Sequence, residues 1–382
     1  MVDICSKIGS GATPRGGKEV YCEDGVSFIR SQNVLDFEFS ESGLVHINNV
    51  QAQKLKNVEV QAGDVLLNIT GDSVARACII EETFLPARVN QHVAIIRGER
   101  NRILSSYLLY FLQLRKKHLL QLASAGATRN ALTKGMIEQL ELDLPTVSIQ
   151  RKIVSVLDLI MKKIALNREI NDNLEQQAMA LYGKFFPYAV TDELPIGWRV
   201  GTVGEIIEIH DSKRIPLSST QRAKMEKRIY PYYGAASLMD YVDEYIFDGK
   251  YLLLGEDGTV VDNDGYPILQ YVYGKFGVNN HAHILTGCLG HSVESLLLLF
   301  RHTSVKSIVT GAVQPKISQA NLRSIQVVIP PHNEMDTFNK LICPLFDQIR
   351  QNQDQNKALM ALRDTLLPGL MSGEIDISNI QL

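Results

Sequence analysis

The chain has 382 residues, of which 45% are hydrophobic and 21% are charged, and its formal net charge is −3. This length suggests two or three domains, and the composition is that of a soluble globular protein. A protein that coats nucleic acid without sequence preference is normally strongly basic. Any contact of this chain with DNA must therefore come from local basic patches or from partners that hold the phosphates.

Signals for export, membrane insertion and zinc binding are absent from the sequence. The longest apolar runs are strand-sized, and the first residues, MVDICSKIGSG, lack the basic and apolar regions of a signal peptide. The five cysteines are scattered and include no Cys-x-x-Cys pair. We therefore expect a cytoplasmic protein with free thiols, without membrane contact, cofactor or metal.

Residues 1–145 are expected to form a first mixed α/β domain. Apolar runs bounded by glycine and polar turns predict strands within 25–34, 64–71 and 90–98. Apolar residues at helical spacing predict the first clear helix at 105–122.

Residues 146–186 are expected to form a first long helix, because apolar residues recur at alternating steps of four and three. Gly183 and Pro187 should end this helix. Two asparagines interrupt its apolar series. The predicted seam positions are Ile153, Leu157, Ile160, Ile164, Asn167, Asn171, Leu174, Ala178 and Leu181.

Residues 187–330 are expected to hold a linker and a second domain of the same plan. Strand-like runs begin at Lys250 and Asn279, and a helix is predicted around 294–302. The stretch LPIGWRVGTV, Leu194–Val203, has no counterpart in the first domain, because VDICSKIGSG corresponds to the chain from Gly204 onward.

Residues 331–382 are expected to form a second long helix and a tail. Residues 126–186 and 311–371 align without a gap at a shift of 185 positions. Pro344 should kink this helix or mark its true start. The matching seam positions are Phe338, Ile342, Leu345, Ile349, Asn352, Asn356, Leu359, Arg363 and Leu366.

The two long helices are expected to pair with each other as an antiparallel coiled coil. An asparagine in a seam lowers stability but fixes register, because its amide must find a polar partner, and both series carry two at matching positions. The predicted fold is therefore α+β, with two similar domains joined by paired helices in a pseudo-twofold arrangement. The alternative is that each helix packs on its own domain.

This layout resembles the specificity subunit of type I restriction-modification systems. The resemblance lies in the order and duplication of several short stretches. They are LPIGW from Leu194, GDVLLNITG from Gly63, NQHVAI from Asn90, NNHAHIL from Asn279 and LLPGLMSGEI from Leu366.

The resemblance implies two target-recognition domains that read a bipartite, asymmetric target in double-stranded DNA. It also implies that the subunit has no catalysis of its own. Its helices would dock two adenine methyltransferase subunits and, through them, restriction and translocase subunits.

Polar residues in loops beside the predicted strands are the candidates for contact with DNA. Arginine can bridge guanine O6 and N7, and asparagine or glutamine can bridge adenine N6 and N7. In the first domain these candidates are Arg30, Gln32, Asn33, Thr70, Asp72, Arg76, Arg88, Asn90 and Gln91. In the second domain they are Lys213, Arg214, Tyr232, Tyr233, Gly234, Glu256, Asp257, Asn280 and His281.

The two duplicated glycine-flanked loops are better candidates for phosphate contact, because basic side chains and open backbone position a protein without reading bases. Support of the helix base is an equally good interpretation of these loops. The residues are Thr128, Arg129, Asn130, Lys134, Gln314 and Lys316.

The sequence also suggests two alternative functions. A coiled-coil scaffold that joins protein partners without reading bases stays open. Enzymes fit less well: Gly17 stands where a phosphate-binding loop needs lysine, and the Pro330-Pro331 pair is not part of a methyltransferase tetrapeptide. His281 and His283 show no third ligand in the sequence, so no metal site is expected.

Overall fold

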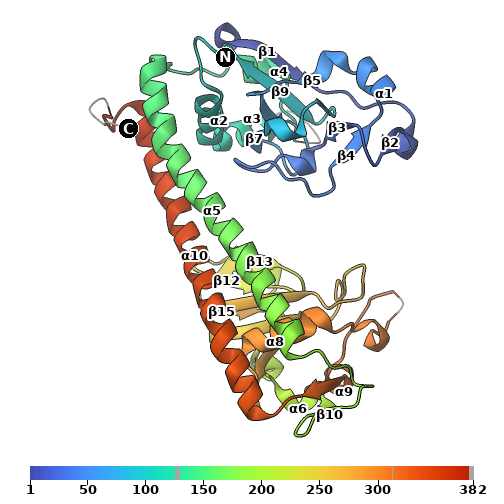
Figure 1. The fold of residues 1–382 in the computed structure, drawn as a ribbon. Coiled ribbons are helices and arrows are strands. Elements are labelled where there is room, and N and C mark those ends of the chain that lie inside the picture. Colours follow the sequence, from blue (N-terminus) through green and yellow to red (C-terminus); the bar gives the residue numbers. More distant parts are fainter. Residues whose placement is uncertain (125–129, 312, 378–382) are drawn as a thin grey trace. The chain divides into compact units, whose positions relative to one another are not determined.

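The computed structural model describes residues 1–124, 130–311 and 313–377, except for the side chain of Lys18 (Figure 1). The chain divides into two compact units. Unit 1 comprises Met1–Ala165 and Asn356–Leu382, and unit 2 comprises Leu166–Gln355. Each unit combines β-sheets with helices, as the predicted α+β class requires.

Unit 1 is built on a four-stranded antiparallel sheet in the order β1-β9-β6-β7. Both faces of this sheet are covered: Leu67 and Ile96 share one core with helix α2, and Leu66 and Ile95 share another with a second sheet. The central strand therefore reads as an unbroken apolar run instead of an alternating one. The strands are β1 (Cys5–Ser10), β6 (Val65–Asn68), β7 (Ala77–Ile79) and β9 (Val93–Gly98).

The second sheet of unit 1 has five short strands in the order β2-β4-β3-β8-β5, and only β3 and β8 run parallel. The helix predicted at 105–122 is two helices that meet at Arg115. The elements are β2 (Tyr21–Cys22), β3 (Val26–Ile29), β4 (Val45–Ile47), β5 (Glu59–Val60), β8 (Ala87–Val89), α1 (Asn49–Lys54), α2 (Ser105–Leu114), α3 (Lys116–Ser124) and α4 (Lys134–Glu138).

Unit 2 contains a six-stranded sheet in the order β11-β16-β14-β15-β12-β13. Leu252 and Leu254 lie in the core shared with helix α8, whereas Leu253 and Ile284 lie in a smaller core on the other side. The elements are β11 (Ile207–Ile209), β12 (Tyr230–Tyr233), β13 (Leu238–Val242), β14 (Phe247–Gly255), β15 (Leu269–Val278), β16 (Ala282–Gly287), α6 (Val203–Ile206), α7 (Ser219–Ala223) and α8 (Val293–His302).

A separate two-stranded sheet of unit 2 joins β10 (Arg199–Thr202) to β17 (Gln326–Ile329). Helix α9 (Gln319–Ser324) precedes β17 and is capped by Ser318, whose side chain accepts from the backbone N–H of Asn321. Thr133 caps α4 in the same way, 185 positions earlier. The sequence of each unit therefore contains the same local signal for the start of this short helix.

The two long helices begin at equivalent positions. Helix α5 is Val147–Phe185 and helix α10 is His332–Ser372. Two expectations were wrong: Gly183 lies inside α5 and does not end it, and Pro344 does not mark the start of α10, which begins at His332. Proline removes one backbone hydrogen bond from a helix, and its ring clashes with the preceding turn. The packing of this 41-residue helix offsets that cost, so the residues around Pro344 stay helical.

Helices α5 and α10 pack together through the predicted seam (Figure 1). In unit 2, Asn167 Nδ2 donates to Gln355 Oε1 at 2.8 Å, and Asn352 Nδ2 donates to Asn171 Oδ1 at 2.8 Å. In these two contacts the residue number rises along α5 and falls along α10, so the two helices run antiparallel. In unit 1, Ile153 and Leu157 of α5 share a core with Leu367 and Leu370 of α10, and Asn356 Nδ2 reaches the Ile164 carbonyl at 3.5 Å.

The remaining seam positions follow the same pattern. Phe338, Ile342 and Ile349 are almost fully buried, and Leu174, Leu181 and Leu345 are half-buried against the same core. Leu366 packs against the core of unit 1, and Ile160 is buried. The described helices include none that is long and apolar enough to cross a bilayer.

Candidate nucleic-acid interface

Unit 2 gathers polar side chains from three loops beside the start of β16. Asn279 Oδ1 accepts from the backbone N–H of His281 at 2.9 Å, and the Asn279 N–H donates to the Tyr233 carbonyl at 3.0 Å. The His281 ring is hydrogen-bonded to Asp257, which forms an isolated β-bridge with Lys316. The buried Asn279 thus shapes a turn that presents the half-exposed His281.

Unit 1 builds the same arrangement from different residues. Asn90 Oδ1 accepts from the backbone N–H of His92 at 3.0 Å, and the Asn90 N–H donates to the Ile29 carbonyl at 3.0 Å. The His92 ring is bonded to Thr70 Oγ1 at 2.6 Å, and Thr70 forms an isolated β-bridge with Ala131.

We define the loop cluster of each unit by these residues. The unit 1 cluster is Thr70, Asn90, Gln91, His92 and Asn130, and the unit 2 cluster is Asp257, Asn279, Asn280, His281 and Lys316. Gln91, Asn130 and Asn280 are exposed, and the Lys316 side chain is 49% exposed. Each cluster therefore offers amide or ammonium donors to a ligand at the surface.

His92 is one of two residues of these clusters that the sequence analysis did not propose. The signal was available, because Asn-x-His occurs at 90–92 and again at 279–281 at matching ends of strands. Asn279 was also not proposed as a site residue, although its equivalent Asn90 was.

An ion-pair network lies behind the unit 2 cluster. Arg214 Nη1 donates to Glu256 at 2.8 Å, Lys316 Nζ lies 3.4 Å from the same carboxylate, and His283 Nδ1 lies 2.6 Å from Asp211. Burial would raise the pKa of Asp211, but the hydrogen bond from His283 and the nearby Arg214 hold it below its ordinary value.

Three potential metal ligands, Asp211, Glu256 and His283, lie within 4.8 Å of one another in this network. Their ligand atoms already serve other partners: both carboxylates are paired with cationic or hydrogen-bonding side chains, and His283 Nε2 bonds the Ile317 carbonyl at 2.8 Å. The described geometry is that of a satisfied buried ion-pair network, which fixes the loop behind the cluster.

Besides Asn90, three proposed base-reading residues have buried side chains that serve the fold. Asn33 is fully buried, accepts from the Arg30 N–H and donates to the Ser40 carbonyl. Arg88 is 5% exposed, and its guanidinium donates to the Ala52 carbonyl. Tyr232 is 1% exposed, and its hydroxyl accepts from the Leu217 N–H. Contact with a base would require breaking these bonds, so the prediction for these residues is corrected.

Other proposed residues hold turns or pack in the interior. Arg30 donates to the Gly43 carbonyl, and Arg214 and Glu256 are committed to the ion-pair network. Gly234 is buried in a turn closed by the Ser237 carbonyl, and Tyr233 packs its ring on Phe276 at 5.9 Å.

The remaining proposed residues that the structure describes are exposed or half-buried. Gln32, Asp72, Lys134, Lys213 and Gln314 are exposed and Arg76 is half-buried. Thr128 and Arg129 lie outside the described residues.

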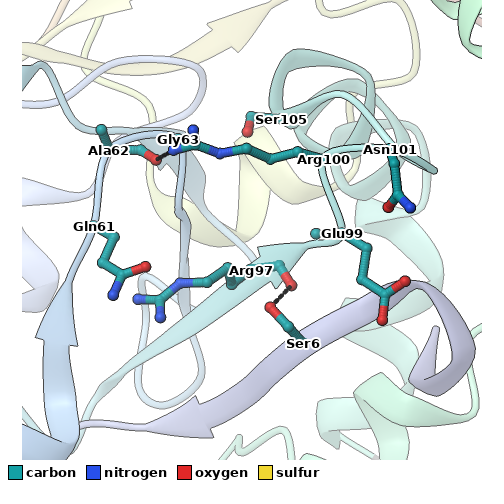
Figure 2. Close-up of a pocket in the computed structure, with 10 residues that line it drawn as sticks. Ser6, Gln61, Ala62, Gly63, Arg97, Glu99, Arg100, Asn101 and Ser105 are labelled. Carbon is teal, nitrogen blue, oxygen red and sulfur yellow. Dashed lines mark hydrogen bonds between the residues drawn. The ribbon is translucent and has the colours of Figure 1, made fainter.

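A polar hollow of about 350 Å³ lies elsewhere in unit 1 (Figure 2). Arg97 and Arg100 line it, together with Ser6 and Ser105. Arg97 Nε donates to the fully buried Asp64 at 2.7 Å, and Arg100 donates to the Ala62 carbonyl at 3.3 Å. None of the proposed DNA-contact residues lines this hollow, and the charge of Arg97 is already neutralised by Asp64.

Comparison with known proteins gives one consistent result. Residues 3–176 and 195–360 match the family model described as type I restriction modification DNA specificity domain. The chain is 24% identical over 311 residues to the type I restriction enzyme MjaIX specificity subunit of Methanocaldococcus jannaschii, covering 74% of this chain and 71% of that protein.

A second relative and one solved structure extend the likeness over nearly the full length. The putative MjaX specificity subunit of the same organism is 20% identical over 409 aligned positions, covering 99% of this chain and 93% of that protein. The crystal structure of the type I restriction-modification S subunit from M. genitalium matches with a TM-score of 0.54 at 15% identity, covering 96% of this chain and 94% of that one. At this identity the structural match supports the shared fold.

Proposed function

The chain belongs to the family of type I restriction-modification DNA specificity proteins, and from this premise we propose that its two loop clusters read the two halves of a bipartite DNA target. The observation that carries the proposal is the duplicated Asn-x-His turn. It occurs in each unit with its asparagine buried and its histidine bonded to a neighbouring loop.

The two clusters present different chemistry on the same framework. Unit 1 offers the Gln91 and Asn130 amides, whereas unit 2 offers Asn280 and the Lys316 ammonium. An amide can bond adenine in a bidentate manner, and lysine can bond guanine or a phosphate. We therefore propose that the two half-sites differ and that the whole target is asymmetric.

We further propose that the long helices dock two methyltransferase subunits and, through them, restriction and translocase subunits. Helix α5 carries large apolar side chains that its own unit does not cover: Leu159 in unit 1 is 60% exposed, and Leu166 in unit 2 is 48% exposed. Exposed leucines on a helix that already buries its seam are typical of a surface that meets another protein. In this proposal the chain contributes no catalytic group of its own.

Mapping of methylated adenines tests the proposal. The chain is co-expressed with its methyltransferase partner, and the host DNA is sequenced for adenine methylation. The Gln91→Ala/Asn130→Ala variant should relax one half-site and leave the other unchanged, and Asn280→Ala/Lys316→Ala should do the reverse. Removal of an amide that bonds a base costs about 1–3 kcal/mol of discrimination.

The result also separates the rival functions. The pairing of α5 and α10 fits a protein scaffold as well, and a scaffold would leave methylation unchanged in both variants. Glu23→Ala, at an exposed loop position of unit 1 that was not proposed to contact DNA, is the matched surface control. Methyl transfer or DNA cleavage by the isolated chain would contradict the non-catalytic role.

A further inference from the structure

The side-chain amide of Gln91, in the unit 1 cluster, is held at both ends by its own unit. Thr13 Oγ1 donates to Gln91 Oε1. Gln91 Nε2 donates to His92 Nε2 at 3.1 Å, because an amide nitrogen has no lone pair with which to accept. The His92 proton is therefore on Nδ1, which donates to Thr70 Oγ1 at 2.6 Å. These bonds fix the orientation of a side chain that is exposed to solvent.

The loop that carries Thr13 is fixed by its backbone to the turn that carries Gln91. The Ala12 N–H donates to the Val89 carbonyl at 3.1 Å. A Cβ atom at Gly11 would clash with the same carbonyl oxygen, so the close approach of the two segments requires glycine at this position. Thr13 is thus held beside Gln91 without help from its own hydroxyl group.

The equivalent side chain of unit 2 is not held in this way. The turn of Asn279, Asn280 and His281 matches that of Asn90, Gln91 and His92, so Asn280 occupies the position of Gln91. Within the part of the chain that the structure describes, the exposed side chain of Asn280 makes no hydrogen bond. The fixed amide is therefore a feature of unit 1.

The fixed amide of Gln91 keeps the groups that can read a base. An amide has two N–H donors and two acceptor lone pairs, and the bonds to His92 and Thr13 use one of each. One N–H and one lone pair remain, on neighbouring atoms. In the major groove, adenine presents the matching pair, because its N6 donates and its N7 accepts.

On the basis of the proposed function, we propose that Gln91 reads an adenine of the unit 1 half-site and that Thr13 is the positioning residue for this contact. Thr13 does not touch the base. Its hydroxyl holds the Gln91 amide in one orientation, so the entropy of fixing this side chain is lost on folding and not on binding DNA. A side chain that is ordered in advance binds more tightly for this reason.

The test compares two substitutions at Thr13 that differ in the hydroxyl group. Thr13→Val has nearly the same shape but no donor, whereas Thr13→Ser keeps the donor. Each variant is purified as the complex with its methyltransferase partner. Methylation is then measured in competition between duplexes that carry the mapped target and differ at one base pair of the unit 1 half-site. Thr13→Val should lose about three- to tenfold of the preference for adenine at one position, and Thr13→Ser should keep it.

Gln91→Ala identifies the base pair that is read and shows whether the two residues act together. It should relax the same base pair as Thr13→Val. The variant Gln91→Ala/Thr13→Val should relax it no further, because the hydroxyl then has no amide to hold. The unit 2 half-site is the internal control and should stay unchanged. The Tm of Thr13→Val should stay within about 2 °C of that of the parent protein, because Thr13 is exposed.

Loss of the preference in Gln91→Ala but not in Thr13→Val would overturn the inference and leave the proposed function intact. A Thr13→Val variant that relaxes several base pairs at once, or that unfolds at a lower temperature, would also overturn it, because a purely structural residue has these effects. A relaxed position that holds no adenine would contradict the assignment of the base.

Unchanged specificity in Gln91→Ala would overturn the inference as well. The proposed function fails only if Gln91→Ala/Asn130→Ala also leaves the unit 1 half-site unchanged, so the two failures are distinguishable.

Discussion

At the scale of single residues, His291 makes the stability of the protein depend on pH. It lies between β16 and α8, it is 9% exposed, and burial lowers its pKa to about 4 from an ordinary value of about 6.5. The unfolded state therefore binds more protons than the folded state between these two values. The stabilisation is complete above about pH 6.5 and falls as the pH falls toward 4.

We predict that His291 alone removes about 2 kcal/mol of unfolding free energy when the pH falls from 7 to 5. Urea unfolding of the full chain at both pH values measures this loss, and the His291→Gln variant should lose correspondingly less. An equal loss in both proteins would assign the pH dependence to other groups. His332→Gln is the control, because the His332 side chain is 70% exposed.

The sequence predicted where the site residues lie along the chain better than it predicted what they do. Asn90, Gln91 and His281 were expected at the ends of strands, and the structure places them in the loop clusters. Arg88 looked equally suitable, but it sits on strand β8 and its partner Ala52 is 36 residues away. Local patterns cannot reveal such a partner, because burial depends on chain segments that the pattern does not include.

At the scale of secondary-structure elements, a buried charge joins two strands and one helix of unit 2 to α8. Glu294 is fully buried and accepts from Lys250 of β14 at 2.6 Å, Tyr271 of β15 at 2.7 Å and Arg350 of α10 at 3.2 Å. Burial by itself would raise the pKa of Glu294, but these donors hold it below its ordinary value. The carboxylate therefore fixes the approach of α10 to the sheet.

We predict that Glu294→Ala lowers the unfolding free energy by about 3–5 kcal/mol, because it leaves partly buried cations without their counter-charge. Chemical denaturation at pH 7 measures the loss. The matched control is Glu175→Ala, which removes a pair with Arg301 whose side chains are both about one third exposed, and its cost should stay below about 1 kcal/mol. Similar losses in the two variants would contradict the special role of Glu294.

The asparagines of the helix pair lead to a second prediction for these elements. Asn171 and Asn352 are both buried and bonded to each other, so Asn171→Leu alone leaves the Asn352 amide without its acceptor and should cost about 1–3 kcal/mol. The double variant Asn171→Leu/Asn352→Leu should recover most of that loss. A double-mutant cycle by thermal or urea unfolding gives the coupling energy, and a value near zero would show that the pair does not act as a unit.

The helix pair was the most predictable part of the fold, and the reason is physical. Its seam is a local repeat that is visible over many turns, and the shift of 185 positions duplicates it without a gap. The continuity of α10 through Pro344 was not predictable, since it depends on packing along the whole helix. The partners of Glu294 were equally hidden, because they lie 44, 23 and 56 residues away.

At the scale of the whole molecule, net charge determines how the chain can hold DNA. The formal charge of −3 provides little general attraction to a polyanion, and one cationic side chain of the unit 2 cluster, Lys316, is partly neutralised by Glu256. We therefore propose that the loop clusters read bases and that partner subunits supply most phosphate contacts.

We predict that the isolated chain binds its target duplex at least about tenfold more weakly than the complex with methyltransferase subunits at physiological salt. The plot of log affinity against log salt concentration should also be shallower for the chain alone, because each phosphate contact adds about 0.9 to the slope. Fluorescence anisotropy with a labelled duplex, measured over a series of salt concentrations, gives both quantities. If the isolated chain matched the complex in affinity and in slope, its own surface would supply the phosphate contacts, and the division of labour between base reading and backbone binding would have to be abandoned.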